Sequence, residues 1–494
     1  MLRMLIVPAL IIGGCTRSFK TPADTLVVGL SAKPATLDPR YATDADGMRI
    51  SGLIFESLVH PGPGFKPAGE AAESWKHGQR RYTFFLRPNL QFHNGRRATP
   101  EDIVFSFDHY RGPKSPFASS LKLIDQVNCH EEGNRLVVEI ELSQESDRFL
   151  ISDLPSIKIL PKKEILSSED TFARQLIGTG PYRFVRNSLN EIRLQSFFAE
   201  TPFLKFKVIR DDYTRYQKLL KGEIDIVQND IPAAKVAEFE KKPNQFRVLR
   251  YPGLNMAYLL VNFKDATLQD LPVRQALAQS LNREEIISFK LNGQARPATS
   301  LLTPENPYQN ANLSNLKFDP EAARKIVAGL GSSGKRLILK TSNAPQTIDN
   351  GKVLAHQMSQ SGLNLELESY EWATFYEDVK KGAFQLALMK WVGNVDPDIY
   401  RSAFHSSEFP PGRNRGFYKN ERLDQLLDQG SKEASMDKRR AVFQQVQRII
   451  HEDLAVLPLW YDEQVVILGQ GVLNYKPSLT SDFLPLAKTH KREL

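Results

Sequence analysis

The chain is 494 residues long, and 41% of these residues are hydrophobic. Because one hydrophobic core rarely serves so many residues, we expect two or three domains. The formal net charge is +8, yet basic and acidic residues are interleaved along the whole sequence. With no basic arm and no helix-turn-helix pattern, this charge is typical of a solvated surface, and we expect no nucleic-acid partner.

The N-terminus has the pattern of a secretory leader. Arg3 is followed by an apolar run from Met4 to Ile12, which is too short to span a bilayer but fits a compact signal peptide. The segment Ile12-Gly13-Gly14-Cys15 resembles a bacterial lipobox, in which the cysteine becomes the lipidated first residue. We therefore predict a lipoprotein signal peptide and lipobox over residues 1–15, with lipidation at Cys15. The mature protein would be a membrane-anchored lipoprotein of the periplasm or cell envelope. A chance cysteine in the leader is the alternative.

The first part of the mature chain contains clear strand, turn and helix signals. Thr25 to Leu30 is predicted as a short strand that leads into a proline-rich loop, Ser31 to Pro39. Thr99 and Pro100, with Asp102 close to capping-box placement, predict the start of a helix. The segment Gly178 to Tyr182 predicts a sharp turn before a strand, because it lacks the spacing and the lysine of a phosphate-binding loop.

The sequence contains an internal repeat. Five positions recur 160 residues apart: Asp211, Thr214, Tyr216, Lys221 and Gly222 correspond to Glu371, Thr374, Tyr376, Lys381 and Gly382. In both copies a predicted strand leads to a short helix, a glycine that tolerates positive φ ends the helix, and an apolar strand follows. Two equivalent units so far apart predict two similar α/β lobes. The alternative is that any strand-helix-glycine-strand unit has this pattern.

The second copy of the repeat ends in a candidate binding segment. Phe384 to Met389 is an almost unbroken apolar run, the pattern of a strand buried on both faces. Trp391, Gly393, Asn394 and the turn-rich Asp396-Pro397-Asp398 follow it. Because ligands of open α/β sheets bind beyond the carboxyl ends of strands, we expect this segment to line a cleft. A core tryptophan followed by an ordinary loop is the alternative.

Short segments spread over the whole mature chain carry a family resemblance. They are Pro34 to Pro39, Phe92 to Phe107, Gly178 to Tyr182, Gly222 to Ile226, Val273 to Ile287, Asp319 to Ala323, Tyr370 to Trp372, Trp391 to Asp398 and Leu457 to Tyr461. In this order they resemble the extracytoplasmic solute-binding proteins of the oligopeptide, dipeptide and nickel ABC transporters, bacterial solute-binding protein family 5.

The resemblance implies an α/β fold of the two-lobed periplasmic-binding-protein type (type II, cluster C) with an additional subdomain in the first lobe. Two crossings, near Val261 to Thr267 and near Trp460 to Val465, would join the lobes. The expected boundaries are 21–50, 178–262 and 462–494 for lobe I, 51–177 for its extra subdomain, and 263–461 for lobe II.

The function implied by the resemblance is that of the ligand-binding component of an ABC importer. Such a protein captures peptides or peptide-like solutes by hinge closure and delivers them to membrane permease subunits. We expect a monomer without a cofactor or metal. The candidate ligand-binding residues are Trp372, Trp391, Val392, Gly393, Asn394, Asp396, Asn255 and Tyr461.

The sequence departs from the peptide-binding pattern of this family at one important position. Peptide binders often place an aspartate three positions after the tryptophan matching Trp391, where it pairs with the peptide's α-ammonium; here the residue is Asn394. The region Thr341 to Ile348, upstream of Trp372, also lacks the arginine that holds a dipeptide's carboxylate. A neutral amide cannot supply the charge pair, so zwitterionic dipeptides are disfavoured unless Asp396 or Asp398 binds the ammonium.

Other classes of function remain open to different degrees. No serine nucleophile elbow, zinc-protease motif or paired redox cysteines are present, so we expect no enzyme. Only Cys129 would remain after processing, so no intramolecular disulfide is expected. A nickel or metal-chelate carrier is the alternative within the family, with His405 as a candidate near the cleft. A solute sensor or a substrate-binding chaperone would use the same closing cleft.

Overall fold

The computed structural model describes residues 20–492, except for 79, 113–114, 145, 147–148, 197, 331–335, 394, 411 and 434. The predicted leader with Cys15 and the predicted site residue Asn394 therefore lie outside the described residues. Within the described chain, every helix is too short or too polar to cross a bilayer.

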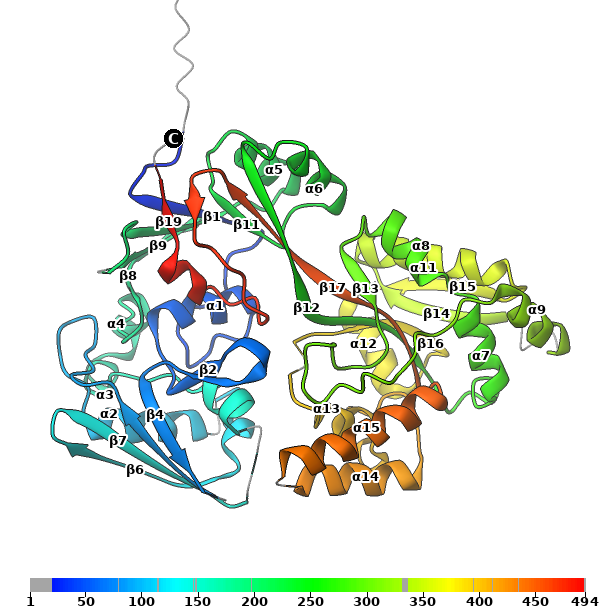
Figure 1. The fold of residues 1–494 in the computed structure, drawn as a ribbon, viewed down its shortest axis with the longest axis horizontal. Helices are drawn as coiled ribbons and strands as arrows, with labels where there is room; N and C mark the ends of the chain where they lie inside the picture. Colours follow the sequence, from blue (N-terminus) through cyan, green and yellow to red (C-terminus); the bar gives the residue numbers. More distant parts are fainter. Residues whose placement is uncertain are drawn as a thin grey trace, which may run out of the picture.

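An eleven-stranded sheet runs through the molecule in the order β15-β14-β16-β12-β17-β11-β1-β10-β9-β8, with β13 paired to β17. The first lobe is built on the β11 to β8 end and the second lobe on the β15 to β16 end (Figure 1). First-lobe strands are β1 (Thr25–Leu30), β8 (Tyr182–Asn187), β9 (Glu191–Ser196), β10 (Phe203–Val208) and β11 (Ile226–Gln228). Second-lobe strands are β13 (Ala295–Pro297), β14 (Arg336–Ser342), β15 (Asn364–Tyr370) and β16 (Leu386–Trp391).

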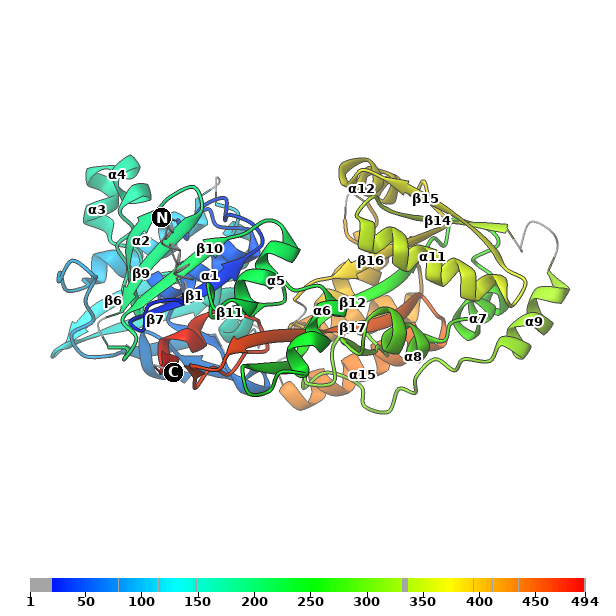
Figure 2. The same ribbon diagram turned by 90° about the horizontal axis from the view of Figure 1, so that it is seen from above.

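Two long strands, β12 (Phe246–Val261) and β17 (Val456–Gly469), connect the lobes and pair antiparallel along most of their length. Figure 2, viewed from above, shows them crossing between the two halves of the molecule. The register of β12 with β17 is interrupted between Pro252 and Met256, and β12 pairs with β16 from Met256 onward. A two-stranded ribbon with an irregularity in it is therefore the physical link between the lobes.

The internal repeat predicted from the sequence is confirmed by the strand pairing. β1 lies parallel between β10 and β11, and β14 lies parallel between β15 and β16. The helices of the two units are α5 (Asp212–Leu220) and α12 (Trp372–Lys381). Asp211 and Glu371 cap their N-termini, and Gly222 (φ 69°) and Gly382 (φ 74°) follow their last turns. Glycine is favoured there because positive φ costs it no steric clash.

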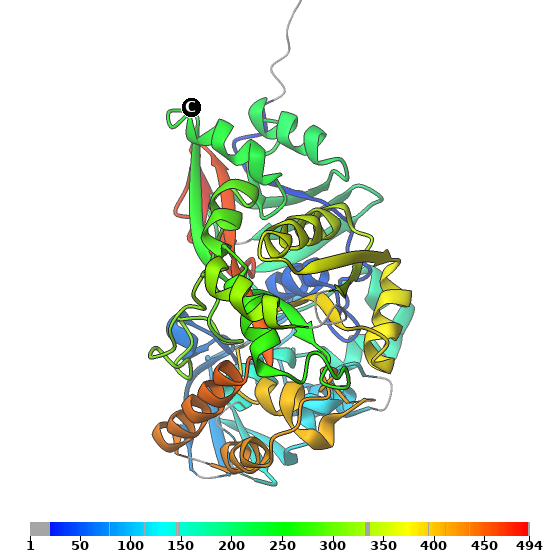
Figure 3. The ribbon, with the colours of Figure 1, turned by 90° about the vertical axis from the view of Figure 1, so that its right-hand side faces the viewer.

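Side-chain alternation along β12 divides the second lobe into two cores. Ala257, Leu259 and Val261 pack with α7, α9 and α11 on one face, whereas Met256, Tyr258 and Leu260 pack with α12 to α15 on the other. Figure 3 has the second lobe toward the viewer, with the orange α14 and α15 at the bottom. The remaining helices are α7 (Leu271–Gln279), α8 (Arg283–Glu285), α9 (Pro320–Gly329), α11 (Pro345–Ser359), α13 (Ile399–Phe404), α14 (Glu421–Lys432) and α15 (Met436–Glu452).

The first lobe carries a second, four-stranded antiparallel sheet in the order β4-β5-β7-β6. One continuous hydrophobic core contains both Phe84 of this sheet and Phe206 of the main sheet. The elements of this region are β2 (Val59–Pro61), β3 (Pro67–Gly69), β4 (Ala72–His77), β5 (Arg81–Leu86), β6 (Ile124–Glu132), β7 (Arg135–Leu142), α1 (Ala45–Ile54), α2 (Pro100–Arg111), α3 (Lys162–Ser167) and α4 (Glu169–Arg174). The lobe is completed by α6 (Ala233–Glu240), β18 (Val472–Leu473) and β19 (His490–Lys491).

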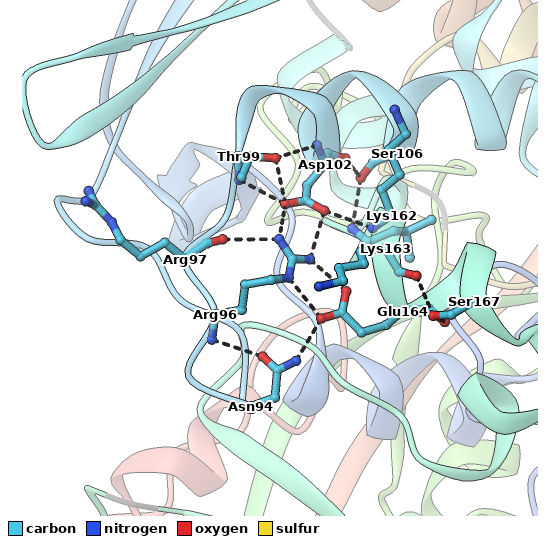
Figure 4. A network of polar contacts seen from close by, with 11 residues as sticks. Asn94, Arg96, Arg97, Thr99, Asp102, Ser106, Lys162, Lys163, Glu164 and Ser167 are labelled. Atoms are coloured by element: carbon cyan, nitrogen blue, oxygen red, sulfur yellow. Dashed lines mark hydrogen bonds and ion pairs between the residues drawn. The ribbon is translucent and has the colours of Figure 1, made fainter.

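A polar network fixes α2 against α3 (Figure 4). The predicted helix start is confirmed, because Thr99 and Asp102 form a complete capping box. The guanidinium of Arg96 donates to Asp102 (2.7 and 3.0 Å) and to Glu164 (2.9 and 2.7 Å). The backbone N–H of Lys162 also donates to Asp102, at 2.8 Å. The buried carboxylate of Asp102 therefore caps the N-terminus of α2, binds Arg96 and accepts a hydrogen bond from the first turn of α3.

Candidate functional site

A pocket of about 810 Å³ lies between the two lobes and is lined from both of them. The carboxyl ends of β11 and β16 point at this pocket from opposite sides, since the residues that follow each strand line it. The floor is formed by Gly253, Leu254 and Asn255 of β12 and by the facing part of β17, residues 462–465. A ligand in this position would contact both lobes and the ribbon that joins them, as in other open α/β sheets.

On the first-lobe side, the loops after β1 and β11 are fastened to each other and to β17. The backbone N–H of Ser31 donates to Asp230 Oδ2 at 3.1 Å. Asn229 has a positive φ of 64°, and its Oδ1 accepts from the Val465 N–H at 2.9 Å. Asparagine tolerates this conformation better than most residues, so the strand can end in a turn here. These bonds present the Asp230 side chain at the pocket wall.

On the second-lobe side, Asn255 positions the loop after β16. Its Oδ1 accepts from the Gly393 N–H at 3.2 Å. Gly393 has φ 67°, and a Cβ added to it would meet no atom within 4 Å. Glycine is therefore favoured there by the backbone conformation and not by crowding. The neighbouring Val392 side chain is 71% exposed at the pocket.

The charges that line the pocket have both signs. The acidic residues are Asp212, Asp230, Asp462 and Glu463, and the basic residues are Arg49, Arg215, Lys290 and Lys390. Lys390 Nζ lies 2.6 Å from Asp462, and Lys290 Nζ lies 3.2 Å from Asp349. Burial raises the pKa of Glu463 despite the two nearby arginines. A lining with matched charges suits a polar ligand better than a simple ion.

The structure brings three of the predicted site residues together, namely Asn255, Val392 and Gly393. Trp391 precedes them at the end of β16, where its ring stacks on Tyr258 with centroids 5.9 Å apart. Trp372 lies at the start of α12, where it is 54% exposed and stacks on Tyr376. Neither tryptophan ring is among the groups that line the pocket.

Two further predicted residues are held in polar networks of the second lobe. Asp396 Oδ1 accepts from the Asp398 N–H at 2.8 Å, and both carboxylates lie near the guanidinium of Arg439 (3.5 and 3.0 Å). The side chain of Tyr461 is 1% exposed, and its hydroxyl donates to the backbone carbonyl of Ser300 at 2.7 Å. Asp396 and Tyr461 do not line the pocket. The ligand-binding roles assigned to them from the sequence stay predictions.

Sequence reasoning missed several pocket residues, above all Asp230, Lys390 and Arg49. The repeat contained the signal for two of them: Asp230 lies shortly after β11, and Lys390, 160 positions later, lies at the end of the equivalent strand β16. Arg49 lies on α1 and reaches the pocket only through the packing of that helix on the sheet, so no local pattern reveals it.

The metal candidate His405 lies outside this pocket. Its buried ring accepts from the Ser407 N–H at Nδ1 (3.0 Å), and its Nε2 lies 3.3 Å from Asp428. Across the part of the chain that the structure describes, no three or more His, Cys, Asp or Glu side chains are grouped as metal ligands would be.

Comparisons with known proteins agree with this architecture. Residues 66–409 match the family model of the bacterial extracellular solute-binding proteins, family 5 (middle region). The oligopeptide-binding protein AppA of Bacillus subtilis is 25% identical, over 96% of this chain and 95% of that protein. The di/tripeptide-binding protein 3 of Pseudomonas aeruginosa is also 25% identical, over 97% of this chain and 96% of that protein.

Solved structures of other proteins share this fold. The substrate-binding protein CtaP of Listeria monocytogenes superposes with a TM-score of 0.84, at 24% identity, over 95% of this chain and 99% of that one. The structure of AppA from Bacillus subtilis in complex with a nonapeptide superposes with a TM-score of 0.75, at 23% identity, over 95% of this chain and 99% of that one. The predicted two-lobed α/β fold is confirmed. The chain belongs to family 5 of the bacterial extracellular solute-binding proteins.

Proposed function

We propose that this protein is the ligand-binding component of an ABC importer and that it captures peptides or peptide-like solutes in the inter-lobe cleft. The observation that carries the proposal is the pocket of about 810 Å³, whose walls come from both lobes. Relatives over nearly the whole chain are named as oligopeptide-binding and di/tripeptide-binding proteins, which supports the ligand class. Delivery would be to the permease subunits of the transporter.

The ligand would be recognised mainly through its backbone and its polar groups. Residues of the loops after β11 and β16 line the pocket on both sides, where backbone groups would pair with an extended chain of amides. Because position 394 is asparagine, a free α-ammonium would need another carboxylate, and the pocket is lined by Asp212, Asp230, Asp462 and Glu463. A neutral or blocked end, or the middle of a longer peptide, would need none of them.

Closure would occur by bending the ribbon of β12 and β17. The register interruption between Pro252 and Met256 supports a hinge there, because backbone already outside the regular ladder changes conformation at the smallest cost in hydrogen bonds. For the domain division we keep the proposal made from the sequence: 21–50, 178–262 and 462–494 for lobe I, 51–177 for its extra subdomain, and 263–461 for lobe II. A hinge between Pro252 and Met256 would move residues 256–262 of this division to lobe II, because residues 256–261 of β12 pack in the cores of the second lobe.

Anchoring through Cys15 would attach the protein to the membrane by the first lobe. The backbone N–H of Thr21 donates to the Gly222 carbonyl at 3.1 Å, and Lys491 Nζ lies 3.0 Å from both the Thr21 carbonyl and Asp225. The first described residues are thus attached to the end of the first lobe, away from the cleft, which would leave both lobes free to close. The mature protein would act as a monomer in the periplasm or cell envelope.

Mass spectrometry of molecules released from the purified protein tests the ligand class. Wild type is expected to release peptides, and an Asn255→Trp variant, which fills the cleft floor, is expected to release far less at equal protein concentration. Peptides recovered equally from both proteins, or a metal chelate recovered in place of peptides, would contradict the proposal.

A further inference from the structure

The inter-lobe cleft has as many acidic as basic side chains, but the protein itself engages the basic ones. Each of the two lysines has a carboxylate beside it. Lys390 Nζ lies 2.6 Å from Asp462, and Lys290 Nζ lies 3.2 Å from Asp349. A negative group of a ligand would compete with these carboxylates for the two ammonium groups, so the lysines offer it little unmatched charge.

The two arginines of the cleft are engaged as well. Arg49 donates to Asp46 Oδ1 at 3.2 Å. Arg215 is 4% exposed, and its guanidinium donates to the backbone carbonyls of Asp230 at 2.6 Å and of Ile209 at 2.5 Å. Arg215 therefore holds the loop after β11 in place, and Arg49 is neutralised by its own helix.

Asp230 is held firmly, yet one of its carboxylate oxygens has no partner. Its backbone carbonyl is bound by Arg215, and its Oδ2 accepts from the Ser31 N–H at 3.1 Å. No described residue donates a hydrogen bond to its Oδ1 or forms an ion pair with this side chain. The carboxylate is half-buried and lines the cleft from the first lobe. It is therefore oriented before any ligand arrives.

The other acidic side chains of the cleft have favourable partners already. Asp462 has Lys390 beside it, and Glu463 lies 3.9 Å from Arg296. Asp212 is in the first turn of α5, where a negative charge interacts favourably with the helix N-terminus. Asp230 is the carboxylate at which a cation of the ligand gains most, because its charge is unpaired and its position is fixed.

Apolar groups lie next to Asp230 on the same wall. Ile231, Pro232 and Ala233 follow it in sequence and also line the cleft. A lysine or arginine side chain carries its charge at the end of an apolar stem of methylene groups, whereas an α-ammonium has no such stem. An apolar wall that ends in an oriented carboxylate therefore complements a basic side chain better than it complements a peptide's N-terminus.

We propose that Asp230 determines the specificity of the cleft by binding the cationic side chain of a lysine or arginine within the peptide ligand. The methylene stem lies along Ile231 and Pro232, and the charged group donates to Asp230 Oδ1. This inference rests on the proposed function and narrows it to peptides that contain a basic residue. Because the charge is on a side chain, the preference holds for peptides with a blocked N-terminus.

Selection from a synthetic library of acetylated peptides of random sequence and mixed length tests the proposal, with the retained peptides identified by mass spectrometry. Wild type is expected to retain peptides in which lysine or arginine is enriched over its frequency in the library. Retained peptides without this enrichment would overturn the role of Asp230 and leave the proposed function standing. Retention of no peptide would overturn both.

Calorimetry on one retained sequence measures the effect of the charge. The lysine peptide is expected to bind wild type roughly tenfold more tightly than the same peptide with norleucine, which keeps the stem and lacks the ammonium. Asp230→Asn keeps an oxygen for the Ser31 N–H and is expected to bind both peptides equally, with the norleucine affinity unchanged. The matched control is Asp125→Asn, an exposed carboxylate of β6 that does not line the cleft, and it is expected to keep the difference.

A contact that forms on closure is the competing role for Asp230, because Lys290 and Lys390 line the cleft from the second lobe. In that case Asp230→Asn would weaken the binding of both peptides by the same factor, and this result would overturn the proposal. If Asp230→Asn fails to fold, Asp212→Asn decides: a lysine preference that persists in this variant supports Asp230, and a preference that disappears overturns the proposal.

Discussion

Replacing Arg96 with alanine is expected to lower the free energy of unfolding of the first lobe by about 3 kcal/mol. The guanidinium makes five hydrogen bonds: two to Asp102, two to Glu164 and one to the backbone carbonyl of Arg97. It also lies 4.7 Å from the centre of the Phe92 ring. Removing one partner from a buried ion pair typically costs about 3–5 kcal/mol. We expect the lower end because Asp102 keeps the N–H groups of Thr99 and Lys162 as donors.

The pH dependence of this effect follows from Glu164. Burial raises the pKa of this carboxyl, but the hydrogen bonds from Arg96 and Asn94 outweigh it and hold the pKa below the ordinary value of 4.5. A lowered pKa stabilises the folded state above pH 4.5, and this stabilisation is lost as the pH falls through the folded-state pKa. The difference in the free energy of unfolding between wild type and Arg96→Ala should therefore be constant around neutral pH and become smaller in acid.

Denaturant unfolding followed by circular dichroism measures this difference, and two further variants make the measurement specific. Arg97→Ala is the matched control, because its guanidinium donates to the Asn134 carbonyl at the exposed surface, and it should change the free energy by no more than about 0.5 kcal/mol. A double-mutant cycle with Glu164→Gln isolates the Arg96–Glu164 pair. A loss below about 1 kcal/mol for Arg96→Ala, against the expected 3–5 kcal/mol for a broken buried pair, or the same loss for Arg97→Ala, would refute the reasoning.

The remaining predictions concern the proposed function. In calorimetry, wild type should bind a peptide with a free N-terminus and its acetylated form with similar affinity. The Asn394→Asp variant should prefer the peptide with the free amine. If wild type already strongly prefers the free amine, another carboxylate binds the α-ammonium. Trp391→Ala should weaken peptide binding by about 2 kcal/mol if the ring is a buried anchor for the ligand. Unchanged affinity would show that the ring only packs on Tyr258 and does not contact the peptide. Cys15→Ala should abolish lipid attachment, and normal processing and detergent partitioning of that variant would contradict the lipobox. Saturation with a tight ligand should reduce the radius of gyration in solution scattering and raise the melting temperature, and identical scattering curves would exclude hinge closure.

Local patterns determined the elements of this protein and much of its architecture. The capping box at Thr99 and Asp102 predicted where α2 begins, because these side chains satisfy N–H groups only three residues away. The repeated glycines Gly222 and Gly382 predicted two equivalent strand-helix-strand units, because few other residues accept the positive φ at the helix end. The apolar run at Phe384 to Met389 likewise predicted the strand whose end forms one wall of the cleft.

Only the tertiary structure decided which side chains meet at the sites. Trp460 and Tyr461 are neighbours in sequence, but strand alternation sends them into opposite cores of the second lobe, and neither reaches the cleft. Asp396 meets Arg439 across 43 positions of sequence, and Glu70 meets Lys158 across a still longer separation. Such encounters depend on sheet register and helix packing, which no short-range periodicity encodes. Hence the sequence by itself determined the strands, the helices and the two-lobed plan, while the convergence of residues from both lobes on the cleft was decided by how those elements pack.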